Sequence, residues 1–189
     1  MDQFLRRKNQ QFLKEDRSIK QSWDNRILKL CEKINKSENY YTTSSCSGRV
    51  LILINDEQKK DDLFLYCSHD LLSFKEIKEE IEKIKIKTNN LVYFKQDPVI
   101  LHIACRNLEY AQKIHDLAKE SGWKKCGIIS TNNRYIVEIS GTDKLEFPLI
   151  NKGKLLVDDE MVKLIVEESN RKFQRSWEKI EKLEKSITI

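Results

Sequence analysis

The feature that most constrains the fold of this chain is a run of five consecutive apolar residues at 50–54, bounded by Arg49 and Asn55. A membrane span needs about 18–20 such residues, so this run is far too short to be one. An unbroken apolar run of this length is typical of a strand that is buried on both faces. We therefore expect a sheet whose inner strand is covered by other elements.

Apolar periodicity predicts further elements along the chain. The expected strands lie at 40–46, 49–54, 63–67, 91–95, 99–106, 123–130, 135–140 and 144–150, with a short one at 154–157. The expected helices lie at 2–15, 24–34, 74–87 and 108–121, with a long C-terminal helix from 158 or 159. Asp24 suits the N-cap of the second helix, and Gly122 suits the position after the fourth.

The order of these elements indicates the fold class. Strands and helices do not alternate regularly, so we expect an α+β fold with a mixed, mainly antiparallel sheet, flanking helices and a long C-terminal helix. A length of 189 residues without a linker predicts a single domain over 1–189. The chain contains neither GxGxxG nor GxxxxGK[ST], which argues against a Rossmann nucleotide site and against a P-loop NTPase.

The positive charge is concentrated near the N-terminus. Residues 1–36 contain ten Lys or Arg and five Asp or Glu, so the whole net charge of +5 lies there. A basic N-terminal segment in an otherwise neutral chain suits binding to a polyanionic partner such as RNA. The alternative is a solvated helix surface in a chain that is rich in lysine.

Cysteine usage and the N-terminal sequence bear on the compartment. The five cysteines are widely spaced and form no CxxC pair, and the first residues contain no apolar signal segment. We therefore expect a reduced, cytoplasmic protein without a membrane span. The Cys and His spacings match no zinc template, so we expect no metal site.

A dense polar segment at 42–49 reads Thr-Thr-Ser-Ser-Cys-Ser-Gly-Arg. On a regular strand Thr43, Ser45, Ser47 and Arg49 share one face, where hydroxyls and a guanidinium suit an anionic, hydrogen-bonding ligand. Gly48 allows a close approach of backbone or ligand. The alternative interpretation is a polar edge strand with a bulge.

Two histidines are candidates for proton transfer. Residues 68–70 read Ser-His-Asp at a predicted strand end, where His69 can act as a base; the alternative is an Asp-capped turn. His102 shares a strand face with Arg106, which indicates a polar groove; the alternative is a solvent-facing sheet surface. A nucleophilic pair of Cys46 with either histidine is a weaker hypothesis, because cysteines are among the most buried residues.

These motifs together resemble those of a known family, the wybutosine-synthesising tRNA methyltransferases, which include the third protein of that pathway and its archaeal relatives. The hallmark Ser-Ser-Cys-Ser-Gly-Arg follows a Tyr-Tyr-Thr-Thr strand without a break at 40–49. Further matching segments follow in order at 68–70, 97–102, 106–109, 122–128, 147–149 and 170–172. The resemblance covers about residues 4–183. One departure is Gln21 or Ser22, where the family usually has a glycine.

The resemblance implies a methyl transfer from S-adenosylmethionine to the N4 ring nitrogen of a 4-demethylwyosine-type tricyclic guanosine, 3′ of the anticodon in phenylalanine tRNA. No metal is needed for such a transfer, and the resemblance says nothing of the oligomeric state. Two other functions stay open, a non-catalytic RNA-binding module and a protein–protein scaffold built on the terminal helix with Phe173, Trp177 and Ile180.

The candidate site residues follow from the polar segment, the histidines and the resemblance. We expect catalytic roles for His69, His102 and Arg49. We expect substrate or cofactor binding by Ser44, Ser45, Cys46, Ser47, Gly48, Arg49, Ser68, Asp70, Arg106 and Asn170. The sequence does not indicate which of these residues bind the cofactor and which bind the tricyclic base of the tRNA.

Overall fold

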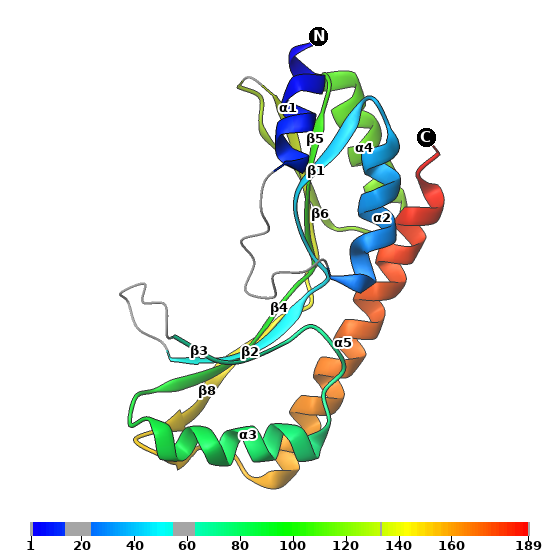
Figure 1. Ribbon diagram of the computed structural model, residues 1–189. Helices are drawn as coiled ribbons and strands as arrows, with labels where there is room; N and C mark the ends of the chain where they lie inside the picture. Colours follow the sequence, from blue (N-terminus) through cyan, green and yellow to red (C-terminus); the bar gives the residue numbers. More distant parts are fainter. Residues whose placement is uncertain (1, 14–23, 55–62, 133, 189) are drawn as a thin grey trace. The chain divides into compact units, whose positions relative to one another are not determined.

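The computed structural model describes residues 2–13, 24–54, 63–132 and 134–188. The helices of this part are α1 (Gln3–Phe12), α2 (Asn25–Lys36), α3 (Phe74–Lys87), α4 (Leu108–Glu120) and α5 (Asp159–Ser186). The strands are β1 (Tyr40–Cys46), β2 (Arg49–Ile54), β3 (Phe64–Ser68), β4 (Val92–Asp97), β5 (Ile100–Cys105), β6 (Lys125–Ser130), β7 (Tyr135–Ser140), β8 (Leu145–Asn151) and β9 (Lys154–Leu155). The predicted α+β class with a long C-terminal helix is confirmed (Figure 1).

The chain divides into two compact units. Unit 1 comprises 1–47, 99–142 and 177–189, and unit 2 comprises 48–98 and 143–176. Helix α5 therefore contributes its first part to unit 2 and its last part to unit 1. The single domain over 1–189 stays a prediction.

Unit 1 is built on a four-stranded sheet with the order β1-β5-β7-β6, in which all strand pairs are antiparallel. Figure 1 shows α2 and α4 on one side of this sheet and α1 on the other. The helices α2 and α4 are amphipathic, and their apolar side chains Leu30, Ile34 and Ile114 are buried together with Leu101 and Val137 of the sheet. This side forms the core of the unit.

Helix α1 packs on the opposite face through two residues that lie one turn apart, Phe4 and Lys8. Phe4 lies against Tyr41, with ring centroids 5.1 Å apart, in a cluster with Ala104. One turn later the Lys8 ammonium donates to the Ser37 carbonyl, and burial lowers the pKa of Lys8. The i, i+4 spacing of Phe4 and Lys8 turns both toward the sheet.

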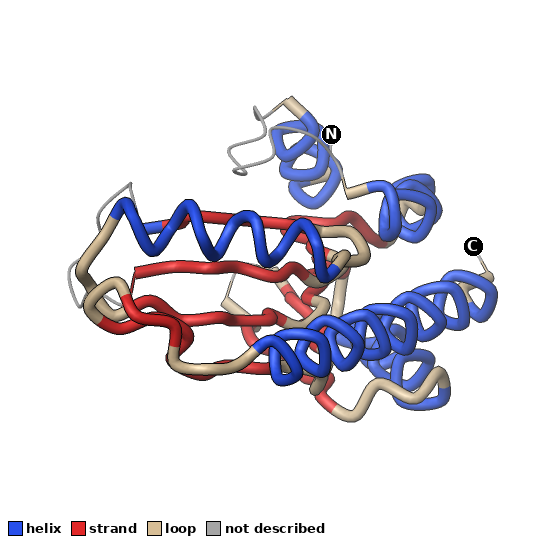
Figure 2. Tube along the Cα trace, turned by 90° about the horizontal axis from the view of Figure 1, so that it is seen from below, coloured by secondary structure: helices blue, strands red, loops and turns tan. Residues whose placement is uncertain are grey.

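Unit 2 is built on a five-stranded antiparallel sheet with the order β3-β2-β4-β8-β9. Figures 1 and 2 show α3 on one face of this sheet, and α3 buries Ile77, Ile81 and Ile84, which lie at helical spacing. Strand β2 lies between β3 and β4, and its residues 50–52 are buried. The prediction of a strand buried on both faces is confirmed for residues 50–52, whereas Leu53 and Ile54 are half-buried.

The prediction that Thr43, Ser45, Ser47 and Arg49 share one face of a strand is wrong. A bulge between Thr42 and Ser44 shifts the register of β1, and β1 ends at Cys46, whereas Arg49 begins β2 in the other sheet. Because each residue beyond the bulge changes face, Ser44 lies opposite His102 and Ser45 lies opposite the buried Leu101. The alternative interpretation, a polar edge strand with a bulge, describes β1 correctly.

The terminal helix buries the apolar stripe that the sequence indicates. Phe173, Trp177, Ile180, Leu183 and Ile187 are all buried. The scaffold hypothesis needed these side chains to be accessible, so their burial removes its main support. No helix of the described ranges is long and apolar enough to cross a bilayer. The departure at Gln21 or Ser22 lies outside the described residues.

The Asp24 carboxylate joins two parts of unit 1. Its Oδ1 accepts from the Arg26 amide at 3.4 Å and caps α2, as predicted. Its Oδ2 accepts from both the amide and the hydroxyl of Ser47, at 2.8 and 2.5 Å. Ser47 is fully buried. The start of α2 and Ser47 of the hallmark segment are therefore held by one side chain.

We predict that Asp24→Ala lowers the free energy of unfolding by about 2–4 kcal/mol, because it removes a helix cap and leaves buried Ser47 donors unpaired. Ser73→Ala is the matched control, since within the described ranges the Ser73 hydroxyl accepts only from the Glu76 amide, at the start of α3. We expect this control to lower the free energy of unfolding by about 1 kcal/mol. Urea denaturation of both variants measures the difference, and equal losses would contradict the double role of Asp24.

Candidate active site

The predicted site residues are distributed over the two units. Unit 1 holds Ser44, Ser45, Cys46, Ser47, His102 and Arg106. Unit 2 holds Gly48, Arg49, Ser68, His69, Asp70 and Asn170.

A row of polar side chains crosses the sheet of unit 1. His102 on β5 lies between Ser44 on β1 and Glu138 on β7 in the strand register. The His102 Nε2 atom is 2.8 Å from Glu138 Oε2, and the His102 side chain keeps 24% of its surface exposed. Within the part of the chain that the structure describes, His102 Nδ1 makes no hydrogen bond. The row thus offers an accessible imidazole that a carboxylate orients, which suits proton transfer.

Glu138 is a partner of His102 that sequence reasoning missed. It stands on β7 between Val137 and Ile139, which are both buried. An acidic residue at the outward position of an otherwise apolar strand was a visible signal. Its partner could not be identified, because the β5–β7 register is a long-range property.

Ser45 and Ser47 are both turned away from the exposed face of unit 1. Ser45 is half-buried and is one of the groups that influence the pKa of the buried Cys31 thiol. Ser47 donates to Asp24, and its carbonyl accepts from Trp177 Nε1 at 3.3 Å. Of the serines at 44–47, Ser44 is the exposed one, and Cys46 is half-buried.

Arg106 is engaged at the edge of unit 1. Its Nε donates to Asn39 Oδ1 and its Nη2 donates to the Glu38 carbonyl, both at 3.0 Å. Its Nη1 pairs with Asp2, and the guanidinium lies 5.2 Å from the centre of the Phe4 ring. The structure thus places Arg106 where it fastens the start of α1, and its predicted binding role stays a prediction.

In unit 2, Arg49 lies directly opposite Asp97 on the neighbouring strand. Arg49 Nε donates to Asp97 Oδ2 at 3.0 Å, and Lys95 Nζ lies 3.4 Å from Asp97 Oδ1. The Phe64 ring centre is 5.9 Å from the guanidinium carbon of Arg49. Two cations around one carboxylate leave this cluster with a net positive charge.

The segment after β3 forms a turn that is fastened to α5 within unit 2. The Asp70 amide donates to the Ser68 hydroxyl at 3.2 Å, and His69 between them is partly exposed. Asn170 accepts from the Leu72 amide at 2.8 Å and donates to the Leu72 carbonyl at 2.9 Å. Asn170 therefore clamps the backbone of the loop that follows His69, and its predicted binding role stays a prediction.

Three thiols are unsuited to nucleophilic chemistry. Burial raises the pKa of Cys31 and Cys126 to about 11 and that of Cys105 to about 12. These thiols stay protonated at neutral pH, and a thiol is a poor nucleophile.

Comparison with known proteins identifies the class. The family model described as methyltransferase TYW3 matches residues 2–188. A human relative named tRNA wybutosine-synthesizing protein 3 homolog is 32% identical over 186 residues, which are 95% of this chain and 70% of the relative. A Methanocaldococcus jannaschii relative is 37% identical over 159 residues, 82% of this chain and 81% of the relative. Its printed name is tRNA(Phe) 7-((3-amino-3-carboxypropyl)-4-demethylwyosine(37)-N(4))-methyltransferase.

The fold gives the same result. The solved structure of the PH1069 protein from Pyrococcus horikoshii matches with a TM-score of 0.85 and 33% identity, over 96% of this chain and 92% of that one. The protein is thus an α+β methyltransferase that lacks the Rossmann architecture. The chain belongs to the methyltransferase TYW3 family, as the resemblance predicted, and its reaction requires a methyl donor.

We predict an unusual pH dependence for the alkylation of Cys126, which is partly exposed. Because its pKa is raised to about 11, the thiolate fraction in the folded protein should rise about tenfold per pH unit up to pH 10. In urea the same cysteine should level off near pH 9, close to the ordinary value. Iodoacetamide rates from peptide mass spectrometry measure both profiles. A plateau near pH 9 in the folded protein would show an ordinary pKa.

Proposed function

We propose that this chain transfers a methyl group from S-adenosylmethionine to N4 of a 7-(3-amino-3-carboxypropyl)-4-demethylwyosine-type base at position 37 of phenylalanine tRNA. The observation that carries this proposal is the family match over nearly the whole chain, together with the names of relatives that this chain covers for 70% or more of their length.

The residues of unit 2 fit the charged end of the donor. S-Adenosylmethionine carries an amino-acid carboxylate, and Arg49 presents a partly exposed guanidinium in a cluster of net positive charge. When bound, the donor supplies an electrophilic methyl group on a positively charged sulfur. This reaction releases a proton from the acceptor nitrogen, and a basic group has to accept it.

In this proposal His102 accepts the proton from N4. Glu138 holds the Nε2–H side of the imidazole, which leaves Nδ1 as the basic atom, and the carboxylate stabilises the imidazolium that forms. The Ser44 hydroxyl beside it donates to the edge of the base. A general base typically raises the rate of such a reaction by about 10²–10⁴-fold.

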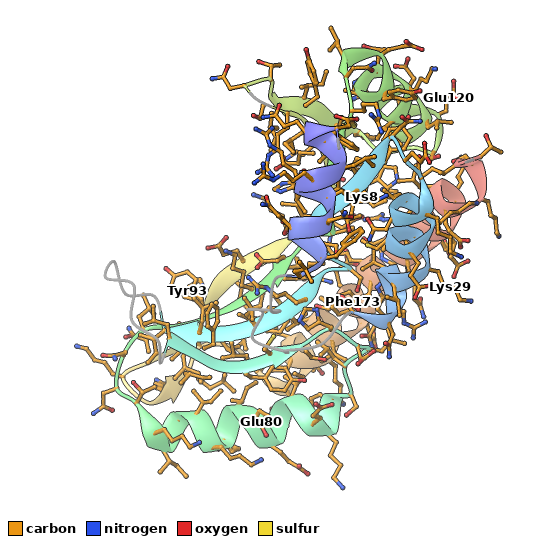
Figure 3. The ribbon with its side chains drawn as sticks, turned by 45° about the horizontal axis from the view of Figure 1, so that its top comes forward. Lys8, Lys29, Glu80, Tyr93, Glu120 and Phe173 are labelled. Carbon is orange, nitrogen blue, oxygen red and sulfur yellow. The ribbon has the colours of Figure 1, made fainter. Side chains whose placement is uncertain are left out.

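The basic helices of unit 1 contact the tRNA backbone. Arg6 on α1 and Lys29 and Lys36 on α2 are exposed, and Figure 3 shows the Lys29 side chain pointing away from the body of its helix. Phosphate contacts of this kind carry no sequence information but position the substrate. In this proposal the polar row of unit 1 selects the modified base.

We predict that His102→Asn lowers the rate of methyl transfer by about 10²–10³-fold without lowering tRNA affinity, because it removes the proton acceptor. The assay combines labelled S-adenosylmethionine with tRNA from cells blocked just before this step, and mass spectrometry of the nucleosides identifies one added methyl on the tricycle. His115→Asn is the control, since among the described residues His115 pairs only with Asp116, on the outside of α4.

Other outcomes of this assay are equally informative. If His102→Asn keeps full activity and His69→Asn loses it, the proton acceptor is His69 of unit 2. A wild-type chain that binds tRNA but neither binds the donor nor transfers a methyl group would be the non-catalytic RNA-binding module.

A further inference from the structure

A row of apolar side chains crosses the sheet of unit 2 on the face that is turned away from α3. Leu53 on β2 lies opposite Phe64 on β3 and opposite Tyr93 on β4, and Tyr93 lies opposite Pro148 on β8. Directly opposite residues of antiparallel strands point to the same face of a sheet. Figure 3 shows that this face is the one opposite α3, because the Tyr93 side chain points to that side. The four residues form the aromatic row of unit 2.

The aromatic row is accessible, whereas the other face of the same strands is covered. Phe64 keeps 45% of its surface exposed, Pro148 is exposed and Tyr93 is half-buried. The next residue of β4, Phe94, is buried on the covered face and stacks on Phe147 with ring centroids 5.3 Å apart. Among the residues that the structure describes, the Tyr93 ring has no such aromatic partner and its hydroxyl has no hydrogen bond. Strand β4 thus places one ring in the core and presents the other on the open face.

The two rings of the row are spaced to take separate flat partners. Neighbouring strands lie about 4.8 Å apart, so the strands that carry Phe64 and Tyr93 are about 10 Å apart. Rings that stack on each other have centroids about 4.5–7 Å apart, so these two rings do not pair, and Leu53 fills the floor between them. The guanidinium carbon of Arg49 lies 5.9 Å from the centre of the Phe64 ring, which holds this ring in place. Two flat groups can therefore each cover one ring.

The charges beside the aromatic row favour a nucleic acid over a protein partner. Lys95 follows Tyr93 by two residues on the same face of β4, and 36% of its side chain is exposed. A further acidic residue, Glu146, lies opposite Lys95 on β8, so the positive charge is concentrated on β2 and β4. The cores of protein–protein interfaces are depleted in lysine and in acidic residues. Sheets that bind single-stranded RNA combine stacking aromatic side chains with cations for the phosphates.

We infer that the aromatic row of unit 2 is a stacking surface for unpaired bases of RNA, and that Lys95 contacts an adjacent phosphate. Every base has a π-face that an aromatic ring can accept, so such a surface needs no particular sequence. This inference rests on the proposed function, in which the occupant is the anticodon loop that contains position 37 of the substrate tRNA. Paired bases are stacked within their helix and cannot cover the rings, so the surface distinguishes an open loop from a duplex.

The first arm of the test measures the Kd of the full chain for an unmodified RNA hairpin with the anticodon-arm sequence of phenylalanine tRNA, without a methyl donor. Phe64→Leu and Tyr93→Leu keep an apolar side chain and remove the ring, and we expect each to weaken hairpin binding roughly 5- to 50-fold. Phe64→Tyr and Tyr93→Phe keep the ring and leave the Kd unchanged. The matched control is Phe74→Leu, because Phe74 on α3 lies across the sheet, in contact with Lys163.

The second arm separates base stacking from contact with the RNA backbone. The hairpin is replaced by a duplex of the same strand with its complement, and the two leucine variants bind this duplex as the wild type does. Lys95→Gln lowers the slope of log Kd against log salt concentration for the hairpin by about 0.7, the value for one phosphate contact in a single strand. Glu146→Gln strengthens hairpin binding, because it removes a carboxylate that repels phosphate.

Three results overturn the inference. One is a wild-type chain that does not bind the hairpin, and another is an equal loss for hairpin and duplex in the leucine variants. The third is unchanged hairpin binding in both leucine variants, which leaves a protein partner as the occupant of the row. Thermal melting of each variant shows that it is folded.

The failure of this surface and the failure of the proposed function give different results. If the wild-type chain binds the hairpin but transfers no methyl group to tRNA, the proposed function is wrong, whereas the leucine variants still decide the stacking surface by binding alone. If methyl transfer and hairpin binding are both normal in Phe64→Leu and Tyr93→Leu, the function stands and the stacking surface is wrong.

Discussion

The hydrogen bonds of the Asp24 carboxylate are the constraint on which the hallmark segment of unit 1 depends. One oxygen caps α2, and the other accepts both donors of Ser47. The Ser47 carbonyl is in turn bonded by Trp177. All polar groups of this buried residue are therefore satisfied, which a buried serine requires for stability. The end of the Ser-Ser-Cys-Ser segment is fixed on the covered side of the sheet.

The anchoring of Ser47 also determines on which face of the sheet the other serines of the segment lie. The bulge between Thr42 and Ser44 and the anchored Ser47 leave Ser44 on the outer face, opposite His102. The next strand adds Glu138, so three strands that are distant in sequence bring together a hydroxyl, an imidazole and a carboxylate. In unit 2, the pairing of β2 with β4 likewise places Asp97 opposite Arg49. In both places an acidic partner on the adjacent strand orients a side chain with proton-accepting or anion-binding capacity.

Local patterns were sufficient to predict the elements. The helix at 74–87, the strands at 40–46 and 135–140 and the N-cap at Asp24 are confirmed, because periodicity and capping depend on neighbours along the chain. The motifs of the hallmark segment were sufficient to predict the family. The sequence could not predict the faces of residues 43–49, since one bulge inverts every side chain beyond it. It also could not predict Glu138 or Asp97 as partners, since strand pairing is long-range.

The most direct test of the anchoring is amide hydrogen exchange at Ser47 in the wild type and in Asp24→Asn. The Asn side chain has one acceptor oxygen in place of two, so it cannot both cap α2 and accept from Ser47. We predict that the Ser47 amide exchanges at least about tenfold faster in the variant, relative to the amides of β7 in the same sample. Exchange of the Ser47 amide that is unchanged relative to β7 would contradict the claim that Asp24 holds the hallmark segment.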